Sequence, residues 1–262
     1  MPTVSVPNAT IHFETRGEGT PLLMLLPQSS GPQGLEPLLV ELARHHTVIT
    51  YHQRGTGLSS RWTEPVSIAQ QAADAARVLD AVNAEHAYLC GHSTGCGIAL
   101  SLVGETGYPS RGLLLANPWT FGDEHLRNMQ RLRIVIARAL EPEQYARHNA
   151  ALLFPPTYRR EHQDGFAELY ERARAAPHNA QDIEHRLEAI LAFDARPMLP
   201  HLRLPITVVT ATDDQLMPSW FAEEIADKAP DVELIELQGG GHMLPETRRA
   251  DIVRSLLAMT GR

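Results

Sequence analysis

Short apolar runs alternate with longer amphipathic stretches along the first half of the chain. The apolar and β-branched runs predict strands at residues 10–14, 21–26, 47–51, 87–90 and 113–116. Helical spacing of the apolar positions predicts helices between them, at residues 35–43, 68–82 and 94–105. This alternation is typical of the α/β class, so we expect a mostly parallel central sheet that is flanked by helices.

The pattern changes in the middle of the chain and then returns. Residues 121–195 carry no strand runs, and prolines divide this charged, helical stretch into three or four predicted helices. Strands are predicted again at 205–210 and 232–237, followed by helices at 220–228 and 248–259. We therefore expect one α/β core, residues 1–119 and 201–262, that is interrupted by a helical cap, or lid, at residues 120–200.

Composition and charge exclude several classes of protein. The chain has 262 residues, of which 43% are hydrophobic, and 31 acidic against 23 basic residues give a net charge of −8. This balance disfavours nucleic acid as a partner, and no apolar run is long enough to predict a membrane span. The start of the chain lacks a signal-peptide pattern, and the two cysteines fit a cytoplasmic protein. Residue spacing indicates no metal site and no cofactor, and it leaves the oligomeric state open.

The sharpest motif is Gly91-His92-Ser93-Thr94-Gly95, which matches G-x-S-x-G. It follows the predicted strand 87–90 directly and opens the predicted helix 94–105, which is the context that a nucleophilic serine requires. The N–H of Thr94 would then be one donor to an oxyanion. The alternatives are a glycine-rich turn with a solvated serine, or a dinucleotide-binding turn, whose glycine spacing this segment does not have.

A serine nucleophile needs a base, and the base needs a carboxylate. His242 follows the last predicted strand in a glycine-rich loop, Gly239-Gly240-Gly241-His242-Met243. Asp213 and Asp214 follow the strand predicted at 205–210, and either could reach His242. The carboxyl ends of parallel strands lie along one edge of a sheet, so we expect Ser93, an aspartate and His242 to meet there.

With these motifs the chain resembles the α/β-hydrolase family along nearly its whole length. The segment YHQRGTGLS at 51–59 is similar to a conserved loop of the family, and TDDQLMP at 212–218 is similar to its acid loop. In that loop the acid lies four residues before a proline, so the resemblance selects Asp214. The cap pattern and these loops look most like small-acid and lactone hydrolases, such as 3-oxoadipate enol-lactonases and aminoacrylate hydrolases.

The resemblance implies a serine hydrolase that cleaves an ester, a lactone or a related small carbonyl compound. The alternatives are a C–C bond hydrolase, a cofactor-free perhydrolase or a non-catalytic receptor for a small ligand. Two positions depart from the family's pattern. Pro27-Gln28-Ser29 replaces the usual His-Gly, so we expect the second oxyanion donor to be the N–H of Ser29, with Gln28 as the alternative donor and as a candidate substrate contact. His52 stands where an aspartate is usual, either as a loop residue near Arg54 or as a substrate contact.

Specificity is expected to come from side chains around the acid and base loops and from the cap. The candidate pocket residues are Trp119, Phe121, Met217, Trp220 and Met243. The alternative for each of them is ordinary core packing. Arg127, Arg131 and Arg133 in the predicted cap either form a solvated helix face or bind a carboxylate of the substrate.

Overall fold

The computed structural model describes residues 2–27, 34–61, 65, 67–176 and 178–261. Their strands form one eight-stranded sheet in the order β1-β2-β4-β3-β5-β6-β7-β8. The strands are β1 (Thr3–Val6), β2 (Ala9–Arg16), β3 (Thr20–Leu25), β4 (His46–Tyr51), β5 (Tyr88–His92), β6 (Gly112–Ala116), β7 (Ile206–Ala211) and β8 (Val232–Leu237). β1 and β2 pair antiparallel, β2 joins β4 antiparallel, and the remaining neighbours are parallel. The predicted α/β class with a mostly parallel sheet is confirmed.

The inner parallel strands β3, β5, β6 and β7 are largely buried, as their apolar runs predicted, whereas the edge strand β8 is mostly accessible to solvent. Every residue of β6 and of β7 is buried. β3 lies between β4 and β5, so the chain first adds a strand on one side of β3 and then continues on the other side. The carboxyl ends of β3 and β5 therefore flank the point where the strand order reverses, which is where open α/β sheets bind ligands.

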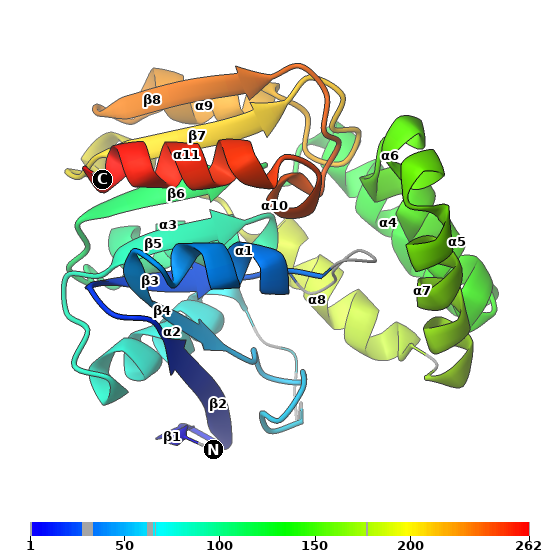
Figure 1. Cartoon of the computed structure of the whole chain (residues 1–262), viewed down its shortest axis with the longest axis horizontal. Coiled ribbons are helices and arrows are strands. Elements are labelled where there is room, and N and C mark those ends of the chain that lie inside the picture. The colour runs from blue at the N-terminus through cyan, green and yellow to red at the C-terminus, as the bar shows by residue number, and fades with distance from the viewer. Residues whose placement is uncertain (1, 28–33, 62–64, 66, 177, 262) are drawn as a thin grey trace.

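Helices cover both faces of the sheet (Figure 1). The helices outside the β6–β7 connection are α1 (Glu36–Leu42), α2 (Ile68–Ala81), α3 (Thr94–Gly104), α9 (Trp220–Lys228), α10 (Leu244–Thr247) and α11 (Arg249–Met259). α1 and α11 pack through Leu42 and Ile252 on one face. α2, α3 and α9 pack on the other face, in the larger of the two apolar clusters.

A helical insertion lies between β6 and β7. Its helices are α4 (Glu124–Ala139), α5 (Pro142–Leu153), α6 (Pro156–Glu161), α7 (Gln163–Ala175) and α8 (Ala180–Ala192), followed by the 3-10 turn η1 (Leu199–His201). They gather beside the end of the sheet toward which the parallel strands point (Figure 1). The described part of the insertion holds more helices than the three or four expected, because Pro155-Pro156 begins the short α6 as a separate element. α4 packs on α8, and α5 packs on α7.

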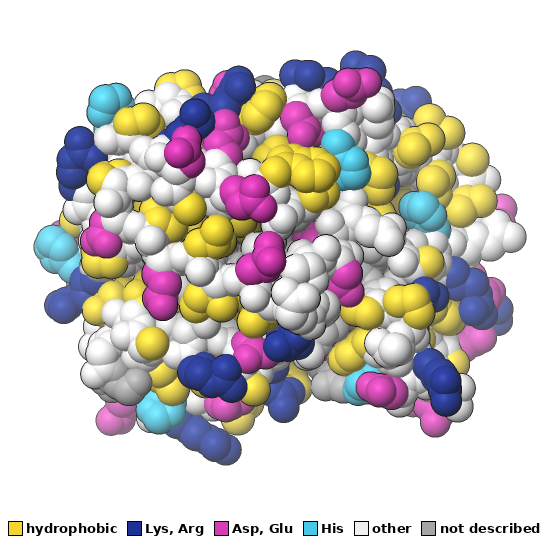
Figure 2. Space-filling model, turned by 90° about the horizontal axis from the view of Figure 1, so that it is seen from above, with side chains coloured by type: hydrophobic (Ala, Val, Ile, Leu, Met, Phe, Trp, Pro, Cys, Tyr) yellow, Lys and Arg dark blue, Asp and Glu magenta, His cyan; other side chains and the backbone are white. Residues whose placement is uncertain are grey.

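The surface of the molecule carries both signs of charge. In Figure 2 the acidic and basic side chains are interspersed over the face that is seen. Among the helices of the described segments, none combines the length and the apolar character needed to cross a bilayer.

Candidate active site

Ser93 occupies a tight turn between β5 and α3. Its backbone has φ +52°, a conformation that L-residues rarely adopt, and its N–H donates to the carbonyl of Ala116 at 3.0 Å. The flanking glycines are required by close packing: a Cβ on Gly95 would lie 1.8 Å from the carbonyl oxygen of Leu25 in β3, and one on Gly91 would lie 2.7 Å from the carbonyl oxygen of Gly95. The motif therefore holds a strained serine at the carboxyl end of a central strand.

Ser93, His242 and Asp214 form a continuous chain of hydrogen bonds. The Ser93 hydroxyl lies 2.8 Å from Nε2 of His242, and Nδ1 of the same ring lies 2.8 Å from Oδ2 of Asp214. All three side chains are buried. In this arrangement the hydroxyl donates to Nε2, and the Nδ1–H donates to the carboxylate. The structure thus brings together the three residues that the motifs selected from separate parts of the sequence.

The two neighbouring aspartates have different partners. Oδ1 of Asp214 accepts N–H donors from Leu216 at 2.8 Å and Met217 at 3.0 Å. Burial opposes the charge of Asp214, but His242 and the N–H of Met217 help to outweigh it and hold the pKa of this carboxyl below its usual value. Oδ1 of Asp213 accepts instead from the backbone N–H of Gly241 at 2.7 Å, so Asp213 orients the loop that carries His242.

Asn117 is a member of this network that the sequence reasoning missed. It follows β6 with φ +50°, and its side-chain amide donates to Oδ2 of Asp214 and, at 3.2 Å, to the carbonyl of Gly241. Asn117 thereby links the acid loop to the base loop. The available signal was its place: a polar residue directly after an apolar strand, at the same edge of the sheet as Ser93.

His92 holds the backbone of His242, and the sequence reasoning missed this role as well. Its Nε2–H donates to the backbone carbonyl of His242 at 2.7 Å. Burial, reinforced by the neighbouring His242, lowers the pKa of His92 to about 3, so this ring is neutral at physiological pH. The first variable position of G-x-S-x-G is therefore occupied by a neutral histidine, whose N–H fixes the loop that carries His242.

The loop after β4 holds His52 away from this network. Nδ1 of His52 accepts from the N–H of Leu58 at 2.9 Å, and its ring packs against His12 at a centroid distance of 4.9 Å. Arg54 is ion-paired with Asp74 on α2 through two hydrogen bonds, at 2.5 and 2.8 Å. These contacts agree with the prediction that His52 is a loop residue. Its ring packs on His12 of β2.

A small cavity of about 40 Å³ lies against Ser93 and His242. The described residues that line it come from the core loops and from the insertion: Pro27, Ser93, Thr94, Gln130, Arg133, Leu153, Leu187, Ile190, Leu216, Met217, His242 and Met243. Met217 and Met243 thus lie where we expected them. The insertion contributes apolar residues from α5 and α8 and two polar residues from α4, and the sequence had singled out only one of these, Arg133.

Three of the expected pocket residues are not among the described residues that line this cavity, which corrects the sequence reading. Trp119 is fully buried in the core, where its Nε1–H donates to the carbonyl of Ile190 at 3.3 Å. Phe121 lies under the guanidinium of Arg196, 3.6 Å from the ring centre. Trp220 is 46% exposed and donates to Asp123 at 3.1 Å. Placement after a strand predicted nearness to the site, whereas these large rings are held by local packing.

Of the expected oxyanion donors, Thr94 lies in the described part of the chain. Thr94 begins α3 and lines the cavity, so its N–H belongs to the first turn of a helix, where backbone donors have no intrahelical acceptor. Gln28 and Ser29 lie outside the described residues.

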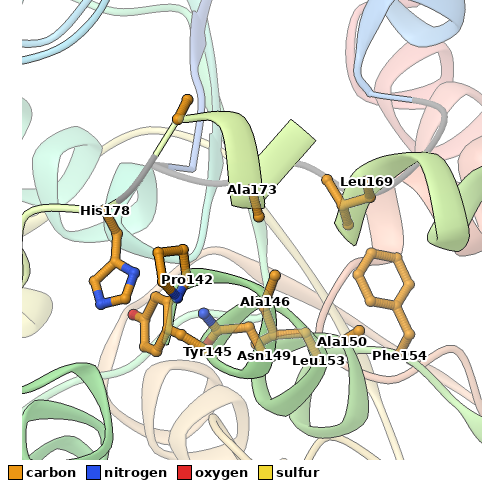
Figure 3. Close-up of a pocket in the computed structure, with 11 residues that line it drawn as sticks. Pro142, Tyr145, Ala146, Asn149, Ala150, Leu153, Phe154, Leu169, Ala173 and His178 are labelled. Carbon is orange, nitrogen blue, oxygen red and sulfur yellow. The ribbon is translucent and has the colours of Figure 1, made fainter. Parts of the chain in front are cut away.

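A second, larger cavity of about 150 Å³ lies within the insertion, between α5 and α7 (Figure 3). Its lining is mostly apolar, with Tyr145 and His178 at one end and Phe154 at the other. Leu153 lines both this apolar cavity and the cavity that holds Ser93.

The sheet order, the strained serine after β5 and the helical insertion after β6 together define an α/β hydrolase. The profile of the Alpha/beta hydrolase family matches residues 29–255, and the chain belongs to this family. It is 35% identical over 244 residues to a protein of Azorhizobium caulinodans that is provisionally named carbamate hydrolase RutD, covering 92% of this chain and 91% of that protein.

Solved structures show the same fold. The α/β hydrolase MGS-M2 from a deep-sea metagenome library superimposes with a TM-score of 0.92 at 15% identity, over 100% of this chain and 98% of that one. The enol-lactonase of Burkholderia xenovorans gives a TM-score of 0.87 at 20% identity, with full coverage of both chains. The chain is thus a hydrolase of the α/β-hydrolase type.

Proposed function

We propose that the protein hydrolyses a small ester, lactone or carbamate through Ser93, His242 and Asp214. The observation that carries this proposal is the unbroken pair of 2.8 Å hydrogen bonds that joins the three buried side chains. A serine hydroxyl is a weak nucleophile until a neighbouring base accepts its proton, and this geometry supplies both the base and the group that orients it.

In the first half of the reaction, Nε2 of His242 takes the proton of Ser93 while Oγ attacks the carbonyl carbon. The negative charge that develops on the carbonyl oxygen is held by the Thr94 N–H and by a second backbone donor, for which Ser29 is our candidate. The protonated His242 then gives its proton to the leaving oxygen or nitrogen. Asp214 stabilises the imidazolium throughout, because its carboxylate accepts the Nδ1–H.

In the second half, water replaces the leaving group. His242 removes a proton from the water as its oxygen attacks the acyl carbon, and the Ser93 oxygen departs with the proton that His242 returns. The products are the free acid and an enzyme in its starting protonation state. A carbamate substrate would follow the same steps and release a carbamic acid, which breaks down to an amine and carbon dioxide.

The size of the site and the relatives support a small substrate. The cavity against Ser93 is small, at about 40 Å³, which favours a compact substrate. The name of the Azorhizobium relative favours a carbamate as one candidate, and this is why carbamates belong in the first substrate panel. We assign the insertion the role of a cap, because Leu153, Leu187 and Ile190 close an apolar wall over Ser93.

Activity measurements on Ser93→Ala test the proposal. Ester, lactone and carbamate substrates are compared for the wild type, Ser93→Ala and the exposed-site control Ser5→Ala. We expect Ser93→Ala to lose at least about 10³-fold in kcat, whereas Ser5→Ala keeps the wild-type rate. A neutral fluorophosphonate is expected to label Ser93 in the wild type. Failure of that labelling, with no turnover of the panel, would favour a non-catalytic receptor.

A further inference from the structure

Arg133 is an unusual member of the cavity that holds Ser93. Among the described lining residues, it is the one side chain besides His242 that can carry a positive charge. Its Nη1 donates to Oε1 of Gln130, one turn earlier on α4, at 2.8 Å. Arg127 and Arg131 lie on the same helix but are exposed to solvent. The sequence left open whether these arginines form a solvated helix face or bind a carboxylate. Two of them are solvated, and the third, Arg133, lines the cavity at Ser93.

Among the residues that the structure describes, no carboxylate forms an ion pair with this cation. The ion pairs formed by the described residues do not include Arg133. Its charged and polar neighbours are the hydroxyl of Tyr145, a second arginine, Arg186 on α8, and His148 on α5. Burial, opposed by Tyr145 and helped by Arg186, lowers the pKa of Arg133, yet a guanidinium stays protonated in proteins. Arg133 is half-buried and its Nε atom is shielded from solvent, and a cation in this position without a counter-charge favours binding of an anion.

Gln130 independently indicates that this part of the cavity binds an anion. Its side chain is fully buried, and its carboxamide oxygen is used by Arg133, which leaves the Nε2 donors. Within the described part of the chain, neither Nε2 of Gln130 nor Nε of Arg133 has a hydrogen-bond partner. Buried donors are rarely left unpaired in native proteins. Two such donors beside one cation match a carboxylate, whose two oxygens accept from several N–H groups at once.

We propose that Gln130 and Arg133 form a subsite for a carboxylate of the substrate, so that the enzyme is selective for short acyl compounds that carry an acid group. The proposal rests on the proposed function, because it assumes that the carbonyl attacked by Ser93 lies in the same cavity. The cavity's volume of about 40 Å³ limits the link between the carbonyl and the acid to a short one. The substrate class is therefore a short half-ester, or a lactone or carbamate with a nearby carboxylate.

A purely structural role is the competing explanation. Arg133 also lies close to Tyr145, and this proximity connects α4 to α5. If that connection were its whole purpose, removing the charge would affect neutral and anionic substrates alike. A carboxylate subsite instead changes the preference between two substrates of the same shape, and that ratio is the decisive measurement.

The kinetic experiment compares monomethyl succinate with dimethyl succinate by release of methanol. The enzymes are the wild type, Arg133→Met, Arg133→Lys and the solvated control Arg131→Met. We expect the wild type to prefer the anionic half-ester, and Arg133→Met to lower the ratio of the two kcat/KM values by about 10- to 100-fold, as for loss of a buried charged hydrogen bond. Arg133→Lys, which keeps the charge without the planar fork, is expected to restore part of the ratio. Arg131→Met should keep the wild-type ratio.

An unchanged ratio in Arg133→Met would overturn the subsite, whatever happens to the absolute rates. If Arg133→Met fails to fold, the uncharged variant Arg133→Gln decides in its place, and a ratio equal to that of the wild type overturns the proposal.

A binding experiment separates this proposal from the proposed function. Titration calorimetry of succinate is carried out on Ser93→Ala and on the same variant with Arg133→Met. We expect binding to weaken at least about 10-fold in the double variant. Equal affinity would overturn the subsite. If fluorophosphonate labelling of Ser93 fails, the serine mechanism is lost, whereas the calorimetry still decides whether Gln130 and Arg133 bind a carboxylate.

Discussion

At the scale of single residues, Asp213 and Asp214 show how neighbours in the sequence divide the work of one loop. Asp214 accepts the Nδ1–H of His242, and Asp213 accepts the backbone N–H of Gly241 through Oδ1. An asparagine at 213 keeps an oxygen that can accept from Gly241. At 214 an asparagine puts an NH₂ group or a neutral oxygen opposite the imidazole, so the ring loses the partner that fixes its tautomer.

We therefore predict unequal effects of the same substitution at the two positions. Asp214→Asn should lower kcat by about 10⁴-fold, and Asp213→Asn by no more than about 10-fold. The measurement is the steady-state rate on the best ester of the panel, with thermal unfolding as a check that both variants fold. Similar losses in the two variants would contradict the assignment of Asp214 as the acid.

The sequence predicted this site in part. Ser93, Asp214 and His242 could be found because each belongs to a motif at the end of a predicted strand. Asn117 and His92 were missed because their partners, a carboxylate and a carbonyl, come from distant segments, and only the place of Asn117 after a strand gave a signal. Gln130 lies on an amphipathic helix, and only the packing of α4 on the core shows which polar positions face Ser93.

At the scale of elements, the contact between α3 and β3 sets how deeply the serine turn is seated. A Cβ on Gly95 would lie 1.8 Å from the carbonyl oxygen of Leu25, so the helix and the strand would have to separate. Gly107, in the loop after α3, offers a matched comparison. It has φ +68°, and a Cβ there would meet nothing within 4 Å.

Alanine at these two glycines should therefore differ in cost. We predict that Gly107→Ala lowers the free energy of unfolding by about 1 kcal/mol through backbone strain alone. Gly95→Ala should cost at least about 3 kcal/mol, because backbone atoms must move. Urea unfolding of the two variants measures both values. If Gly95→Ala were as stable as Gly107→Ala, the close approach of α3 to β3 would be wrong.

The elements themselves were predictable where their patterns are continuous. The buried parallel strands and the helices of the core lie within a few residues of their predicted positions. β1 was missed because it is a short edge strand in which one of four residues is buried, so it has no apolar run. The helix predicted at 248–259 is preceded by the separate α10, since Pro245 favours a new helical start.

At the scale of the whole molecule, the buried His92 links global stability to pH. Its pKa of about 3 in the folded protein lies below the ordinary histidine value of about 6.5 expected in the unfolded chain. Between these values the unfolded chain binds a proton that the folded protein does not. The contribution of His92 to stability is therefore fully present above about pH 6.5 and is lost as the pH falls from there toward 3.

We predict that His92→Gln, which keeps a side-chain N–H donor for the carbonyl of His242, removes this part of the pH dependence. From pH 7 to pH 5, the wild type should lose about 2 kcal/mol more free energy of unfolding than the variant loses. Urea titrations at the two pH values provide the comparison. If the two proteins lose the same free energy of unfolding between pH 7 and pH 5, the lowered pKa of His92 is not the source of this pH dependence.

The backbone of the insertion also reaches into the core. The N–H of His242 donates to the carbonyl of Leu153, the last residue of α5, at 3.0 Å. The part of the chain that shapes the substrate cavity is thus also one of the supports of the residue that we assign as the base. In evolution or in protein engineering, this insertion is not a freely exchangeable module. An insertion taken from another hydrolase must place a backbone carbonyl where that of Leu153 lies. Without it, the N–H of His242 loses its acceptor and the imidazole is no longer held in position.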